Sequence, residues 1–176
     1  LVLGIIERPG ERGGHSLYCS LVYIDQDGTI RKVHRKLQPT YEERLVWSPG
    51  DGHGLRTFPV ENFTLGALNC WENWMPQARH ALYGCGAEVH VAIWPGDVRL
   101  TQDITRFVAR EGRIFVLSAG ATLRRQDIDE RLPVLAELPE LTASAFFQDG
   151  GSCVAGPDGQ WRVEPSSGVR GLVIAD

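Results

Sequence analysis

Residues 64–76 have the sequence TLGALNCWENWMP, in which an apolar run stops at a cysteine and an aromatic-rich turn follows. This pattern predicts a buried strand over Leu65–Asn69 that turns sharply into a helix, because Pro76 suits the first helical turn, where its missing N–H costs nothing. Cys70 would then lie near unpaired backbone N–H groups and the positive end of a helix dipole, which both favour thiolate over thiol. We therefore predict a nucleophilic cysteine, although an inert buried cysteine would give the same local pattern.

Length and composition indicate one globular domain of 176 residues, long enough to bury a core. The net charge of −4 gives no reason to expect a nucleic acid or an acidic membrane surface as partner. No apolar run approaches the roughly 20 residues of a membrane span and no secretory signal is recognisable, so we expect a cytoplasmic protein without a membrane partner. The cysteines lack paired metal-ligand spacing, so we expect no metal and no other cofactor; they are Cys19, Cys70, Cys85 and Cys153.

Around the central strand, predicted strands alternate with amphipathic helices, a pattern typical of an α/β or α+β fold built in layers. The predicted helices are Pro76–Cys85, a second one that Thr101 or Asp103 caps and that ends at Glu111, and a further segment at Leu132–Leu138 or Leu141–Phe147. The predicted strands are Leu1–Ile6, Leu17–Ile24, Thr29–His34, Leu55–Pro59, Phe63–Asn69, Val89–Trp94, Ile114–Ala119, Ser152–Ala155, Gln160–Glu164 and Leu172–Ala175.

Further motifs accompany Cys70 in a fixed order along the chain. HRKLQPT at 34–40 is followed by YEERLVW at 41–47, LNCWENW at 68–74 and VAIWPG at 91–96. Together they resemble the nitrilase branch of the carbon-nitrogen hydrolase superfamily, and the Cys-Trp-Glu sequence favours nitrilases over the amidase and carbamoylase branches. The resemblance covers nearly the whole chain. It implies one domain over residues 1–176 with the four-layer αββα sandwich of this superfamily, here incomplete.

The same resemblance implies roles for individual residues. Cys70 would be the nucleophile, Lys36 would stabilise the tetrahedral intermediate, and Glu43 would be a second glutamate that orients the site. Without the family, Lys36 would more simply be a solvated charge at a strand end, and Glu43 a partner of Arg35 or Arg44. The residues expected to bind substrate are Trp71, Glu72, Trp94 and Pro95.

The implied reaction is the hydrolysis of an organic nitrile to a carboxylic acid and ammonia through a covalent thioimidate and a thioester on cysteine. The implied partners are a small-molecule nitrile and further copies of the chain, in a homodimer, a larger homo-oligomer or a filament that pairs through helices at about 76–85 and 101–112. Three alternatives stay open: another carbon-nitrogen hydrolase acting on an amide, a carbamoyl group or cyanide; a non-catalytic assembly module; and a papain-like hydrolase, although none of the five histidines has a recognisable motif around it.

The family's principal catalytic glutamate is expected on a segment before Leu1, and a tail used in oligomer contacts after Asp176. Glu7 occupies a different motif position and does not fill that role. We therefore predict that residues 1–176 alone release no ammonia from a nitrile whereas the complete protein does, because a carboxylate must transfer protons to and from both waters. An ammonia assay on both forms at equal concentration measures this, and full activity of the short form would contradict it.

Overall fold

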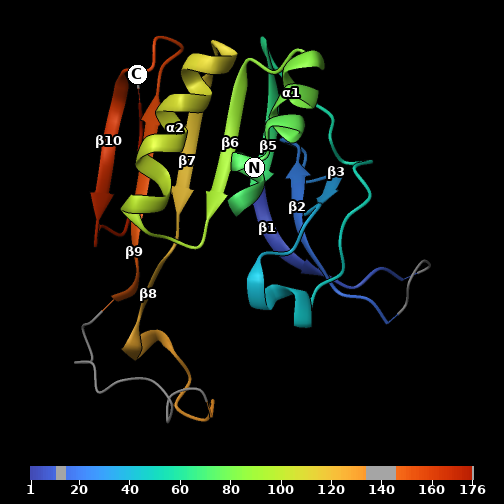
Figure 1. The fold of residues 1–176 in the computed structure, drawn as a ribbon, viewed down its shortest axis with the longest axis vertical. Helices are drawn as coiled ribbons and strands as arrows, with labels where there is room; N and C mark the ends of the chain where they lie inside the picture. Colours follow the sequence, from blue (N-terminus) through green and yellow to red (C-terminus); the bar gives the residue numbers. More distant parts are fainter. Residues whose placement is uncertain (11–14, 134–145, 176) are drawn as a thin grey trace.

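The computed structural model describes residues 1–10, 15–133 and 146–175, which form two β-sheets and two α-helices (Figure 1). An antiparallel sheet of order β1-β2-β3 contains β1 (Val2–Glu7), β2 (Tyr18–Ile24) and β3 (Ile30–Arg35). A seven-stranded sheet has the order β10-β9-β7-β6-β5-β4, with β8 paired to β9. Its strands are β4 (Phe58–Val60), β5 (Phe63–Asn69), β6 (Val89–Trp94), β7 (Phe115–Gly120), β8 (Thr122–Arg124), β9 (Phe146–Ala155) and β10 (Trp161–Ser167).

Two helices connect the parallel strands at the centre of the larger sheet. Helix α1 (Pro76–Gly84) joins β5 to β6, and α2 (Val98–Gly112) joins β6 to β7. Both lie on the same face of the sheet (Figure 1), as expected when right-handed crossovers step across a sheet in one direction. Within the described ranges, no helix combines the length and the apolar character needed to cross a bilayer.

Strand β5 contacts a different layer on each of its faces. Leu68 packs with Ala78 and Leu82 of α1, whereas its neighbour Ala67 packs with Leu21 and Tyr23 of β2. Successive side chains of a strand point to opposite faces, so one residue step separates the helical layer from the smaller sheet. The described residues thus form a helix–sheet–sheet arrangement, which confirms the α/β layers of the predicted sandwich in its incomplete form.

Several predicted boundaries are wrong. Helix α2 begins at Val98 because Asp97 caps it, accepting a hydrogen bond from the Arg99 backbone N–H at 2.8 Å. The residues predicted to cap that helix, Thr101 and Asp103, lie inside it instead.

Several strand predictions also differ from the structure, among them the following. No strand forms at 172–175, where Leu172 is 86% exposed. The strand predicted over Leu55–Pro59 is the shorter Phe58–Val60, and that over Ser152–Ala155 starts earlier, at Phe146. The alternative helices at 132–138 and 141–147 fall mostly outside the described residues, and Phe146 and Phe147 belong to β9.

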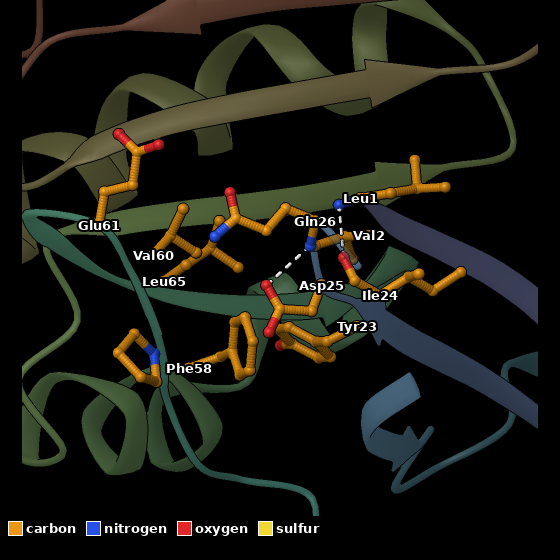
Figure 2. Close-up of a pocket in the computed structure, with 11 residues that line it drawn as sticks. Leu1, Val2, Tyr23, Ile24, Asp25, Gln26, Phe58, Val60, Glu61 and Leu65 are labelled. Atoms are coloured by element: carbon orange, nitrogen blue, oxygen red, sulfur yellow. Dashed lines mark hydrogen bonds between the residues drawn. The ribbon is translucent and has the colours of Figure 1, made fainter. Parts of the chain in front are cut away.

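A cavity of about 390 Å³ opens where the turn after β2 faces β4 and β5 (Figure 2). Its lining includes the rings of Tyr23 and Phe58, whose centroids lie 6.1 Å apart. The acidic residues Asp25 and Glu61 also line it. Cys70 is not among its lining residues. Cys70 lines a different cavity, which is described below.

We predict that Leu82→Ala lowers the free energy of unfolding by about 2–5 kcal/mol, because the fully buried side chain of Leu82 connects α1 to β5. The matched control Leu172→Ala should change it by less than about 0.5 kcal/mol, since Leu172 is exposed outside any strand. Urea unfolding followed by circular dichroism compares the two, and equal losses would contradict the layer assignment.

Candidate active site

Cys70 lies at the carboxyl end of β5, the edge at which open α/β sheets place their ligands. It is the first residue of a short 3-10 helix, Cys70–Trp74, which precedes α1 and which we call the Cys70 turn. Its backbone φ of 56° is in the left-handed region, which residues other than glycine rarely adopt. The sharp strand-to-helix turn predicted at Cys70 is therefore present, with Pro76 at the start of α1. Such a strained residue persists only where its surroundings hold it.

Lys36 follows β3 and is 1% exposed, so it is not a solvated charge at a strand end. Its Nζ donates to Oε2 of Glu43 at 2.5 Å, and the same oxygen accepts the Thr40 backbone N–H at 2.5 Å. A buried ammonium without a carboxylate partner would be strongly destabilising. Glu43, on the 3-10 helix Tyr41–Leu45, supplies that partner. The alternative partners expected for Glu43 bind elsewhere: Arg35 pairs with Glu7, and Arg44 Nε donates to the Pro39 carbonyl.

Cys70 and Glu43 line one cavity of about 330 Å³. Trp94 and Pro95, at the carboxyl end of β6, also line it, and the Trp94 indole N–H donates to Ser118 Oγ at 3.1 Å. Most of the lining is apolar, and its other members are Gly4, Ile5, Ile6, Cys19, Trp47, Asn69 and Ile93. In the described part of the chain, no group of three or more His, Cys, Asp or Glu side chains is placed to hold a metal ion.

Trp71 and Glu72, which were also expected to bind substrate, do not line this cavity. The Trp71 side chain is 47% exposed and lies beside Trp74, with ring centroids 6.0 Å apart. Glu72 is buried, and its carboxylate contacts protein groups only. His34 Nε2 lies 3.1 Å from each carboxylate oxygen, and the backbone N–H groups of Leu37 and Asn69 donate to Oε1 and Oε2 at 2.7 and 3.0 Å.

Glu72 therefore joins the two segments that carry the predicted catalytic groups. Leu37 follows Lys36 directly, and Asn69 precedes Cys70 directly. The carboxylate holds both backbones through hydrogen bonds, which are stronger to an ionised acceptor than to a neutral one. Side chains alternate along β3, so His34 points to the same face as Lys36, which directly follows the strand. This spacing is the sequence signal from which a role for His34 near the site could have been predicted.

Burial raises the pKa of the Cys70 thiol above its ordinary value. The Lys36 charge and the neighbouring Trp71 backbone N–H lower this pKa, while Glu43 and Glu72 raise it. The backbone N–H groups and the helix dipole at the turn, on which the sequence prediction rested, favour the thiolate. In the structure desolvation outweighs these effects and shifts the balance of Cys70 toward the thiol.

Cys19 is a member of this cavity that the sequence argument missed. Its Sγ accepts a hydrogen bond from Asn69 Nδ2 at 2.8 Å. Burial raises the pKa of the Cys19 thiol to about 11, so little of this cysteine is in the nucleophilic thiolate form at neutral pH. A lone cysteine in a strand carries no sequence signal for this position.

A family model described as carbon-nitrogen hydrolase matches residues 1–176. The bifunctional nitrilase/nitrile hydratase NIT4B of Lupinus angustifolius is 36% identical over 178 residues, which cover 100% of this chain and 50% of that protein. An aliphatic nitrilase of Sinorhizobium fredii is 37% identical, with 100% and 54% covered. The chain thus spans about half the length of the curated relatives it matches.

Solved structures share the fold. A carbon-nitrogen hydrolase from Helicobacter pylori G27 superposes with a TM-score of 0.75 at 21% identity, covering 95% of this chain and 57% of that one. Nit3 of Saccharomyces cerevisiae, described as a member of branch 10 of the nitrilase superfamily, gives a TM-score of 0.69 at 17% identity, covering 95% and 55%.

We predict that alkylation of Cys70 by iodoacetamide accelerates with rising pH and inflects above the ordinary thiol value, because only the thiolate reacts and burial raises the pKa. Lys36→Met should move the inflection to still higher pH, since the variant lacks the cation that favours the thiolate. Arg31→Met, which removes an exposed cation paired with Asp25 and Asp27, is the matched control and should leave it unchanged. Peptide mass spectrometry measures the rates, and an inflection below the ordinary value would contradict the prediction.

Proposed function

The chain belongs to the carbon-nitrogen hydrolase family, and on that premise we propose that its protein is a nitrilase, which hydrolyses an organic nitrile to a carboxylic acid and ammonia. One observation carries the proposal: a buried cysteine at a strained turn shares an apolar cavity with Glu43, and the Glu43 carboxylate binds a buried lysine. This combines a nucleophile, a fixed positive charge and a pocket for an uncharged substrate.

In the first step the Cys70 sulfur adds to the nitrile carbon, and an electron pair of the triple bond moves to nitrogen. The thiol proton is lost as the C–S bond forms and a proton is gained by nitrogen, so a neutral thioimidate results. Negative charge develops on nitrogen during the attack. We propose that the Lys36 ammonium, with the Trp71 backbone N–H next to the sulfur, stabilises this charge.

In the second step a water adds to the thioimidate carbon, the C–N bond breaks and ammonia leaves, which gives a thioester. A second water then cleaves the C–S bond and releases the carboxylic acid and the thiol. Both waters need a group that accepts and returns protons. Because the Glu43 carboxylate is engaged by Lys36 and Thr40, we assign Glu43 to orientation of Lys36 and keep the proton transfers for the further glutamate that the family implies.

An amide is a second possible product of this chemistry, and the lupin relative is a bifunctional nitrilase/nitrile hydratase. The tetrahedral intermediate formed by the first water can expel either ammonia or the cysteine sulfur. Expulsion of the sulfur forms an amide and regenerates the thiol. The ratio of acid to amide therefore reports how often the C–N bond breaks instead of the C–S bond in this intermediate.

We further propose that the protein pairs with copies of itself through the outer surfaces of α1 and α2. Large aromatic side chains are exposed on and near these helices, among them Trp74 and Phe107. A hollow lined by Pro76, His80, Tyr83 and further residues of the helices lies beside them.

We also propose that the protein is located in the cytoplasm. Its four cysteines are free, which agrees with a reducing compartment.

We predict that Cys70→Ser abolishes ammonia release from a nitrile, because the hydroxyl lacks the nucleophilicity of the thiolate, whereas Cys85→Ser, which changes an exposed thiol, retains it. The complete protein should convert a nitrile to acid and ammonia, with a covalent adduct on Cys70 detected by mass spectrometry. Cleavage of the matching amide in preference to the nitrile would instead support an amidase. Retained activity in Cys70→Ser would overturn the nucleophile.

A further inference from the structure

A buried asparagine, Asn73, supports the Cys70 turn on a different side from Glu72. The side-chain Nδ2 of Asn73 donates to the Cys70 carbonyl at 2.9 Å and to the Leu68 carbonyl at 3.3 Å. One of these carbonyls belongs to the nucleophile itself and the other to β5 just before it. The amide thus bridges the segment in which Cys70 has its φ of 56°.

His90, on β6, determines which way this amide points. Its Nε2 lies 2.7 Å from Asn73 Oδ1. Because Nδ2 donates to two carbonyls, Oδ1 is the acceptor and His90 Nε2 carries the proton. Burial, with the Arg79 charge, lowers the pKa of His90 to about 4, so the ring is neutral near pH 7.

The other ring nitrogen of His90, Nδ1, is buried as well. Within the described residues His90 Nδ1 has no partner, so Asn73 receives the one hydrogen bond that the ring makes. A buried polar atom without a partner is unfavourable for folding. The hydrogen bond that the ring does make, between Nε2 and Asn73 Oδ1 at 2.7 Å, indicates that His90 orients Asn73.

The backbone of Asn73 is fixed as well. Arg79 Nη1 donates to the Asn73 carbonyl at 2.9 Å, and the guanidinium is held by both carboxylate oxygens of Glu111, at 2.7 and 3.1 Å. Residues of α1, α2 and β6 therefore converge on Asn73. Asn73 itself does not line the cavity.

We propose that Asn73, oriented by His90, is a positioning residue for the nucleophile and holds Cys70 in the left-handed conformation that presents its sulfur to the cavity. Without the amide, the Leu68 and Cys70 carbonyls lose their donor and the turn can relax toward negative φ. The sulfur then moves relative to Lys36 and the Trp71 N–H. This inference rests on the proposed function for its effect on turnover, but the placement of the sulfur can be measured separately.

The test uses the complete protein and the variants Asn73→Ala and His90→Gln. Asn73→Ala should lower kcat roughly 10- to 100-fold with KM little changed, as expected for a small displacement of a reacting atom. His90→Gln should lower it less, because an amide can still donate to Asn73. The control is Thr101→Val, which removes a buried hydroxyl that donates to the Gly151 carbonyl at 2.9 Å, and it should lower the thermal midpoint but not kcat.

A second readout is the rate at which iodoacetamide alkylates Cys70, a displacement of iodide by sulfur that requires no nitrile. Asn73→Ala should slow it, His90→Gln should slow it less, and Thr101→Val should not. If the unaltered protein hydrolyses no nitrile, the proposed function fails while this comparison still decides the inference. Unchanged alkylation in Asn73→Ala, or an equal loss in Thr101→Val, would overturn the inference. If Asn73→Ala does not fold, His90→Gln decides by the same two outcomes.

Discussion

The buried carboxylate of Glu72 is the interaction on which the candidate site depends. A carboxylate removed from water is strongly destabilising unless its oxygens are hydrogen-bonded, and here His34, Leu37 and Asn69 occupy both oxygens. These partners come from two different sheets, so satisfying one charge fixes the end of β3 against the end of β5. Lys36 and Cys70 lie next to these contacts, and their separation is therefore determined by the docking of the sheets.

The cavity has the apolar lining that the proposed uncharged substrate needs, and it raises the pKa of the proposed nucleophile, Cys70. Burial at its apolar lining raises the pKa of Cys70, and a less polar surrounding strengthens the electrostatic interactions there. The Lys36 cation acts in the opposite direction on the same thiol. A buried ammonium held by Glu43 can stabilise negative charge that appears only during the reaction, because it needs no reorientation at that moment.

Local pattern was sufficient for the turn at Cys70, since the apolar run, the cysteine and Pro76 are neighbours in sequence. The roles of Lys36 and Glu43 were predicted from the family resemblance, because no pattern within their own segments indicates that they face a cysteine more than twenty residues away. The start of α2 was missed because Asp97, Thr101 and Asp103 are all residue types suited to cap it, and only the backbone geometry selects one.

The contacts of Glu72 and Asn73 could not be predicted either, because only the backbone geometry of the turn decides where their side chains point. Together the two residues explain the shape of the turn. The two residues are consecutive on a 3-10 helix, whose three residues per turn direct neighbouring side chains about 120° apart. Glu72 therefore reaches toward His34 of the smaller sheet, while Asn73 reaches toward His90 of the larger one. If the turn were α-helical, the angle between the two side chains would change only slightly. Both side chains would, however, move along the helix axis relative to His34 and His90. The short 3-10 segment lets one strained cysteine be held from two layers at once.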